Sequence, residues 1–325
     1  MTSCTTVAIV AAAVVLASVV QVAPAAALPT RTWVAKSGDD HNPCTVTAPC
    51  ATLQAAHLNT APGGTISVLT PGDYGPVLIS KAINITNDAV GEAGILSGGS
   101  SGVTIQAGSG DVVSMRGLVI DGQGAASGFS GIVYRAASAV HVQNCVIRNF
   151  QTTGPNGSNG ITVELSGTDR GKLFVSDTLV SDNGRTGTAN GYGISAQAVQ
   201  SASLSVVLNR VRVENNAQGI AADNSVSAAM WMIVRDSVVS GNGGDGIFAG
   251  TTSFVFVTGS SVVDSGNFGI QTLGSGAILM SKTTVARNGV GLASSLAGRI
   301  VSYRNNEIDN NLGPDGAPTA FNAPR

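Results

Sequence analysis

Hydrophobic positions in this chain recur within a motif in which a glycine is followed by Ile or Leu. The seven copies are Gly131-Ile132, Gly160-Ile161, Gly193-Ile194, Gly219-Ile220, Gly246-Ile247, Gly269-Ile270 and Gly291-Leu292. Successive aliphatic residues of the motif are 29, 33, 26, 27, 23 and 22 positions apart. A period that drifts through the twenties indicates a solenoid, in which any binding site lies along one long lateral face.

A second β-rich motif follows each Gly-Ile pair. It reads Val142-Gln143-Asn144 and then Val146-Ile147, and it returns in the next three repeats. Most copies end in an asparagine: Asn183, Asn215, Asn242, Asn288 and Asn311. We therefore expect two short strands in each repeat, separated by turn residues, and no helix in the repeat region.

Stacking explains this pattern, because one unit cannot bury its apolar face alone. Stacked units pair their strands in parallel with the coils above and below, at a spacing of about 4.8 Å. Asparagine tolerates the left-handed backbone region at a bend, and its amide can bond to the asparagine of the next coil. The pattern predicts an all-β fold, a single-stranded right-handed parallel β-helix. A β-sandwich is the alternative, but its strands would not keep one motif in register over seven repeats.

A short helix is expected before the first coil. Thr52 or Ala51 can start it, and Pro62-Gly63-Gly64 ends it. Such a helix would cover strand edges that otherwise invite aggregation.

The domain limits follow from these elements. We expect an N-terminal segment with a cysteine pair and the capping helix over 28–64, and the β-helix over 65–312. The segment 313–325 contains three prolines and is expected to form a loose cap or a disordered end.

The N-terminus predicts export. Residues 1–27 carry no charged side chain, are rich in Ala and Val, and end in Pro24-Ala25-Ala26-Ala27. This pattern predicts a signal peptide over 1–27 that is cleaved after Ala27, and a protein that is secreted, periplasmic or on the cell surface. The usual basic residues are missing from its start, so an uncleaved anchor stays open. No later segment is long and apolar enough to span a membrane.

Charge and cysteine usage add to this interpretation. Only 11% of the 325 residues are charged and the net charge is −2, which argues against a nucleic-acid partner. Cys44 and Cys50 each follow a proline, and in an exported protein we expect them to form a disulfide. A metal site with His41 and Asp39 or Asp40 is the alternative, but it has too few ligands. We expect no metal and no cofactor.

Cys145 interrupts a strand motif. It is interpreted as a small buried filler rather than a nucleophile, because no histidine is placed to activate it.

The resemblance to known proteins rests on two stretches. The run from Pro62 to Leu69 and "PGDYGPVLI" from Pro71 to Ile79, followed by the Gly-Ile coils, resemble the pectin-lyase-like superfamily of right-handed β-helices. "NPCTVTAPCATLQAA", from Asn42 to Ala56, resembles small exported bacterial right-handed β-helix repeat proteins. The resemblance implies the fold over about residues 31–311. It implies no single activity, because members include lyases, hydrolases, adhesins and proteins with no assigned reaction.

The known catalytic signatures of that superfamily are not matched. Where polygalacturonases carry Asn-Thr-Asp, Asp-Asp and Arg-x-Lys, this chain reads Ser158-Asn159-Gly160, Gly244-Asp245-Gly246 and Arg299-Ile300-Val301. The sequence contains no Gly-His-Gly. It also lacks the Trp-x-Asp-His and Arg-x-Pro-x-x-Arg runs of the commonest pectate lyases.

Register predicts a polar ladder instead. If each Ile of the motif points inward, the side chains one and three positions later point outward. Glu164 and Asp223 then lie two coils apart, roughly 9–10 Å, and Asp245 lies one coil further. Such carboxylates are candidate catalytic residues, because paired acids can divide acid and base roles.

The same ladder contains candidate substrate contacts. Arg135 can form a two-pronged bond to a carboxylate, Gln197 can bond to hydroxyls, and Tyr192 offers a ring for a sugar to stack on. An ordinary solvated surface would also carry some charges of this kind, so that interpretation stays open.

Two functions follow as expectations. The first is an exported β-helix that binds carbohydrate or cell-envelope glycan without a recognised catalytic motif. The alternative is a polysaccharide lyase or glycoside hydrolase with a non-standard acidic site on the Gly-Ile sheet. The sequence leaves the ligand and the oligomeric state open.

Overall fold

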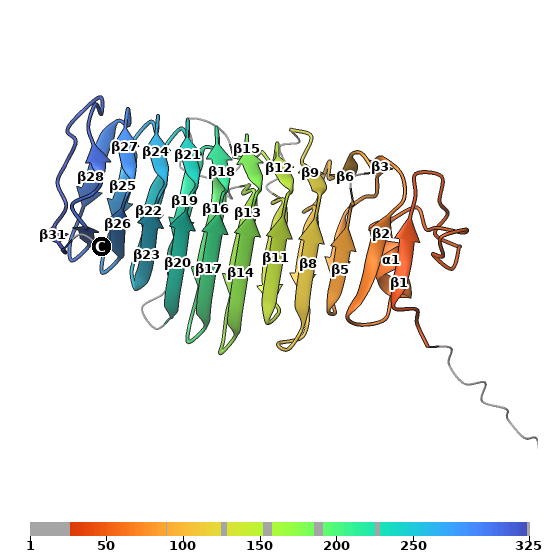
Figure 1. Cartoon of the computed structure of the whole chain (residues 1–325). Helices are drawn as coiled ribbons and strands as arrows, with labels where there is room; N and C mark the ends of the chain where they lie inside the picture. The colour runs from red at the N-terminus through yellow and green to blue at the C-terminus, as the bar shows by residue number, and fades with distance from the viewer. Residues whose placement is uncertain are drawn as a thin grey trace, which may run out of the picture.

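The computed structural model describes residues 27–323 apart from 89, 125–128, 152–157, 185–190 and 225–227. The expected signal peptide lies outside the described residues, except for Ala27. Within the described residues, the chain winds into coils that stack along one axis, and their strands form three sheets of parallel strands that run along the stack (Figure 1).

The first sheet, sheet A, has twelve strands within the described part of the chain. They are β1 (Arg31–Val34), β2 (Gly64–Val68), β5 (Ile83–Thr86), β8 (Val112–Arg116), β11 (Ala139–Gln143), β14 (Arg170–Ser176), β17 (Ser203–Asn209), β20 (Ala229–Arg235), β23 (Ser253–Thr258), β26 (Ala277–Ser281), β29 (Arg299–Ser302) and β31 (Ala320–Phe321).

Sheet B has ten described strands, each only two to four residues long. They are β3 (Gly72–Asp73), β6 (Ala93–Leu96), β9 (Leu118–Asp121), β12 (Val146–Arg148), β15 (Leu179–Ser181), β18 (Arg212–Glu214), β21 (Val238–Ser240), β24 (Ser261–Val263), β27 (Thr284–Ala286) and β30 (Glu307–Ile308).

Sheet C has nine strands among the described residues and carries the Gly-Ile motif. They are β4 (Val77–Ile79), β7 (Val103–Gln106), β10 (Ile132–Ala136), β13 (Ile161–Leu165), β16 (Tyr192–Ala198), β19 (Gln218–Ala222), β22 (Ile247–Ala249), β25 (Phe268–Thr272) and β28 (Val290–Ser294). The described helix is α1 (Leu53–Asn59).

Each full coil therefore holds three strands, and the expectation of two strands was wrong. The second motif is divided by a residue in the left-handed region, such as Asn144 with φ 51°. The chain turns sharply there, so that Val142 belongs to β11 of sheet A and Ile147 to β12 of sheet B. Three-residue strands are too short to show a period of their own.

The register expected for the Gly-Ile motif is confirmed. Ile132, Ile161, Ile194, Ile220, Ile247, Ile270 and Leu292 pair directly from coil to coil. All seven are buried in the core. The glycine before each of them lies where sheet B meets sheet C. A Cβ at Gly160 would collide with Val180 and with the Asn183 amide, so the motif needs glycine for space.

An asparagine ladder runs beside this column, but Asn216 rather than Asn215 belongs to it. The Asn183 amide donates to Asn216 Oδ1 at 3.0 Å, and the Asn216 amide donates to Asn242 Oδ1 at 3.2 Å. Asn215 instead takes a left-handed φ of 55° at the exposed corner. Ser265 interrupts the ladder, which resumes from Asn288 to Asn311.

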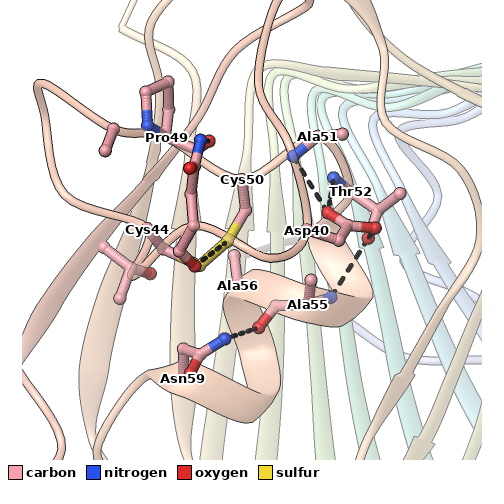
Figure 2. Close-up of a disulfide and its surroundings, with 12 residues drawn as sticks. Asp40, Cys44, Pro49, Cys50, Ala51, Thr52, Ala55, Ala56 and Asn59 are labelled. Carbon is pink, nitrogen blue, oxygen red and sulfur yellow. Dashed lines mark hydrogen bonds between the residues drawn. A yellow bond between two sulfur atoms is a disulfide. The ribbon is translucent and has the colours of Figure 1, made fainter.

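Two elements cap the N-terminal end of the β-helix, and the first of them is a disulfide loop. The Cys44–Cys50 disulfide is present, as expected (Figure 2). Its loop pairs with β1, a strand that the sequence did not predict. Trp33 N–H donates to the Cys44 carbonyl at 2.9 Å, and Ala35 N–H donates to the Cys50 carbonyl at 3.0 Å. The loop therefore covers the open edge of sheet A.

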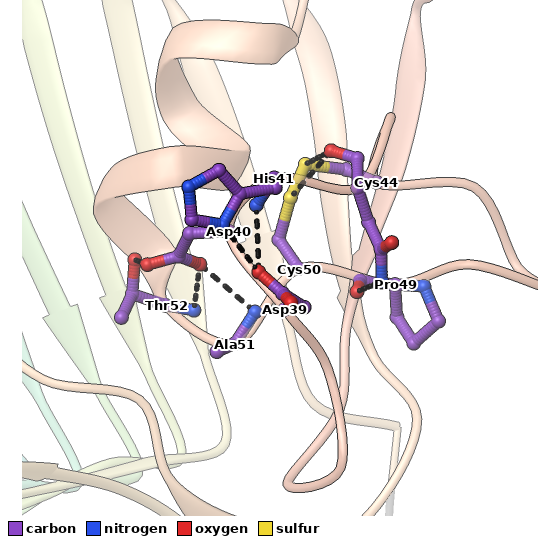
Figure 3. Close-up of polar contacts among 9 residues, drawn as sticks. Asp39, Asp40, His41, Cys44, Pro49, Cys50, Ala51 and Thr52 are labelled. Atoms are coloured by element: carbon purple, nitrogen blue, oxygen red, sulfur yellow. Dashed lines mark hydrogen bonds and ion pairs between the residues drawn. A yellow bond between two sulfur atoms is a disulfide. The ribbon is translucent and has the colours of Figure 1, made fainter.

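The second element is the predicted capping helix. Thr52 is its N-cap and accepts from Ala55 N–H at 3.1 Å. Asp40 holds this start in place by accepting from the N–H groups of Ala51 and Thr52, both at 2.9 Å (Figure 3). An acceptor for the free N–H groups at a helix start stabilises it.

At the other end, the C-terminal segment contributes β31, which pairs with β29. The Arg304 guanidinium lies 4.6 Å from the centre of the Phe321 ring. The described part of this segment thus packs on the last coil of sheet A.

Candidate functional site

Two adjoining cavities lie on the outer face of sheet C. Their volumes are about 500 and 540 Å³, and both are lined by Gln106 and Arg135. Because they share these residues, they form one groove from α1 across β4, β7, β10, β13 and β16, which we call the sheet C groove. Four strand steps make it about 19 Å long.

The groove has a polar half. Its lining includes Gln106, Arg135, Glu164, Asp169 and Gln197. Arg135 Nε donates to Glu164 Oε2 at 3.3 Å, and both side chains are about half exposed, at 52% and 47%. The pair forms because β10 and β13 are neighbours and both residues stand three positions after the inward Ile.

The other half of the groove is mostly apolar and hydroxylic. Leu78 and Phe129 expose 49% and 41% of their surfaces there. Gln54 of α1 forms the end wall, where its side-chain oxygen accepts from Leu78 N–H at 2.8 Å. An exposed apolar surface next to hydrogen-bonding groups is typical of a ligand cleft.

The structure brings together three of the predicted site residues. Arg135, Glu164 and Gln197 line the same cavity, and Glu164 is paired directly with Gln197 between β13 and β16. Their gathering follows from the register that the Gly-Ile motif predicts.

Asp223 and Asp245 are not among the described residues that line this groove. Asp223 follows the end of β19, and its carboxylate fills the space above Gly250. Asp245 precedes β22 and accepts from the Asn267 amide at 2.8 Å and from Phe268 N–H at 3.2 Å. The two acids thus stand at opposite ends of neighbouring strands. Burial raises the pKa of both carboxyls.

Tyr192 belongs to the neighbourhood of these acids. Its N–H donates to Asn159 Oδ1 at 2.7 Å. Burial raises the pKa of the Tyr192 hydroxyl, with smaller contributions from the charges of Asp245 and Asp223. The predicted residues therefore divide into the groove set and a second polar set, in which Tyr192 begins β16 and the two acids flank β19 and β22.

Several groove residues were not predicted from the sequence. Gln106 stands three positions after Val103, which pairs with Ile132 and belongs to the same inward column. The signal was present, because Gly102-Val103 is the Gly-Ile motif with valine in place of isoleucine. Asp169 lies in the turn between β13 and β14, which carries no repeated motif and gave no signal.

A smaller apolar hollow of about 290 Å³ lies on sheet A. Trp231 is 59% exposed there, with its ring centre 4.5 Å from that of Phe254. These side chains stand outward on β20 and β23 and were not singled out from the sequence.

The described residues contain no group of three or more His, Cys, Asp or Glu side chains placed to hold a metal ion. Burial raises the pKa of the Cys145 thiol to about 11, which agrees with its interpretation as a filler. In the described part of the chain, no helix is long and apolar enough to cross a membrane.

Comparisons with known proteins agree with this architecture. The family described as "Right handed beta helix region" matches residues 192–316. The crystal structure of pectate lyase Pel9A superposes with a TM-score of 0.63 at 16% identity, covering 91% of this chain and 80% of that one. The two comparisons together establish the fold of the chain as a right-handed β-helix.

A second similar structure is the enzymatically active domain of tailspike protein 2 from bacteriophage CBA120. This β-helix superposes on it with a TM-score of 0.51 at 13% identity, covering 82% of this chain and 42% of that one. No curated protein matches the sequence. At such low identities the similarity to solved structures establishes the fold only. The activity has to be argued from the side chains of the site.

Proposed function

We propose that this β-helix is exported and binds an extended polysaccharide in the sheet C groove. The observation that carries the proposal is the continuity of the two cavities, which share Gln106 and Arg135 and follow the axis of the coil. A groove open along its length suits a chain ligand better than a small molecule. The similarity to a pectate lyase supports a carbohydrate ligand, and the disulfide supports export.

The lining supplies both kinds of contact that a sugar needs. Leu78 and Phe129 offer apolar surface to the flat faces of sugar rings. Gln106 and Gln197 offer amides that donate and accept hydrogen bonds to hydroxyl groups.

A catalytic role is the second candidate. Glu164 and Asp169 place two carboxylates in one cavity, and glycoside hydrolases act with a carboxylate pair. A hydrolase would release reducing ends, and a lyase would release unsaturated products that absorb light.

The test is calorimetric titration of the purified protein with a panel of oligosaccharides, while reducing ends and absorbance are followed in parallel. Gln106→Ala and Gln197→Ala should each weaken binding about fivefold, because each removes a hydrogen bond worth about 1 kcal/mol. Gln143→Ala is the matched control, since Gln143 is an exposed glutamine on sheet A. Equal affinities for all four proteins would refute the groove as the site.

Export has its own test. If cleavage follows Ala27, the protein recovered outside the cytoplasm begins at Leu28. Terminal sequencing that starts at Met1 would support the anchor instead.

A further inference from the structure

We infer that the sheet C groove selects uncharged polysaccharides and discriminates against polyanionic ones. The inference rests on the proposed function and concerns the same site. It follows from the charges of the described lining residues. Arg135 contributes one positive charge, and Glu164 and Asp169 contribute one negative charge each, so the lining sums to −1.

Arg135, the single cation among the described lining residues, is already neutralised. Arg135 Nε is bonded to Glu164 Oε2 at 3.3 Å, and the two side chains are half exposed. To bind the Arg135 guanidinium, a sugar carboxylate would have to displace the Glu164 carboxylate or lie close to it. Asp169 faces the same cavity and adds a second repulsion. Like charges that are brought together across an interface disfavour the wrong partner and so contribute to specificity.

An uncharged sugar meets no such penalty. The ion pair uses Nε of Arg135 and Oε2 of Glu164, so the Nη groups and Oε1 can bond to hydroxyls without breaking it. Hydroxyl groups donate and accept, so one sugar can satisfy both partners of the pair. Beyond Arg135, the described lining of the second cavity consists of uncharged groups such as Leu78, Phe129 and Thr104.

The experiment compares two classes of glycan on the same protein. Neutral probes are gluco-, manno- and galacto-oligosaccharides, and acidic probes are oligogalacturonate, oligoalginate and hyaluronan fragments, each measured at low salt with calcium and with chelator. The wild-type protein should bind at least one neutral probe about tenfold or more tightly than every acidic probe.

Removing the negative charges should shift this preference. The double variant Glu164→Gln with Asp169→Asn changes the lining from −1 to +1 and releases Arg135. Its ratio of acidic to neutral affinity should rise about tenfold or more, and the gain should vanish in high salt. Asp182→Asn with Asp236→Asn is the control, because it changes the net charge equally at two exposed corner residues outside the groove. The control should keep the wild-type ratio.

Three results would overturn the inference. Acidic probes that bind the wild-type protein as tightly as neutral ones, with or without calcium, would refute the selectivity and leave the binding function standing. An unchanged ratio in the groove variant would show that these charges do not set it. If neither class binds, the proposed function fails and the inference falls with it.

Discussion

At the scale of single residues, two helix side chains complete the open edge of sheet C. Gln54 accepts from Leu78 N–H at 2.8 Å, and His57 Nε2 accepts from Ser80 N–H at 3.2 Å. Residues three apart on a helix lie on one face, and alternate N–H groups of a strand point to one side. Because a backbone N–H can only donate, His57 Nε2 must be unprotonated in the folded protein.

This contact predicts acid sensitivity. Burial, with a smaller contribution from Lys81, lowers the pKa of His57 from 6.5 to about 4. Between these values the unfolded chain binds the proton and the folded chain does not, so stability falls as the pH drops from 6.5 toward 4. His57→Gln cannot titrate and should flatten this part of the curve.

Thermal unfolding followed by circular dichroism between pH 3.5 and 7.5 measures the effect. His141→Gln is the control, since His141 lies on the outer face of sheet A and away from the cap. It should keep most of the wild-type slope. A slope that is the same in the wild type and in His57→Gln would contradict the role of His57.

At the scale of elements, the inward column of sheet C stabilises each coil against its neighbours. Ile220 pairs with Ile194 on one side and with Ile247 on the other. In a solenoid, stability is close to a sum over neighbouring units, so damage to one central coil weakens two interfaces.

Truncating a side chain of this column should measurably lower the stability of the protein. Ile220→Ala should lower the free energy of unfolding by about 2–5 kcal/mol, because it removes buried methylene groups and leaves a cavity. Gln271→Ala changes an outward residue of the same sheet and should cost under about 0.5 kcal/mol. Denaturant titration compares the two. Equal midpoints for both variants would mean that the register is wrong.

The disulfide loop predicts a local effect as well as a global one. Replacing Cys44 and Cys50 by Ser should cost about 2 kcal/mol, as expected for a short closed loop. The amides of Trp33 and Ala35, which donate to the loop, should also lose protection from hydrogen exchange. The amides of β13 serve as the internal control. Unchanged exchange at Trp33 and Ala35 would show that the loop covers the edge without the disulfide.

The elements also show what the sequence could predict. The Gly-Ile column was readable because every copy fills the same place in the core. Sheet B was not, because Val146–Arg148 is only three residues long and follows a sharp turn inside one motif. Asn216 was confused with Asn215 because adjacent asparagines fill two different roles at one corner.

The candidate site was also predicted only in part. Register placed Arg135, Glu164 and Gln197 on one face, and the structure puts them in one groove. Counting coils gives the position of a residue along the axis, but a residue before a strand and one after it lie a strand length apart. By their position along the axis, Asp245 and Asp223 were predicted to lie close together. Because Asp245 precedes its strand and Asp223 follows its own, the structure separates them.

At the scale of the whole molecule, the groove crosses sheet C from β4 to β16, the strands of that sheet that lie nearest the N-terminal cap. Gln54 belongs to both the groove and the N-terminal cap, since it forms the end wall of the groove and completes the edge of β4. Coils at the far end, such as those of β25 and β28, contact the groove only through the strands between them.

This arrangement predicts where a bound glycan stabilises the protein. A ligand at a hundredfold excess over its dissociation constant stabilises the folded state by about 2.7 kcal/mol, and in a solenoid the gain should concentrate in the coils it touches. Hydrogen exchange with the best-binding glycan of the panel should therefore slow the amides of β7, β10 and β13 most. The amides of β25 and β28 should change little. Gln197→Ala at the same glycan concentration should reduce the protection, and Gln143→Ala should not. Protection centred on β19 and β22 instead would move the site to the coils that carry Asp223 and Asp245.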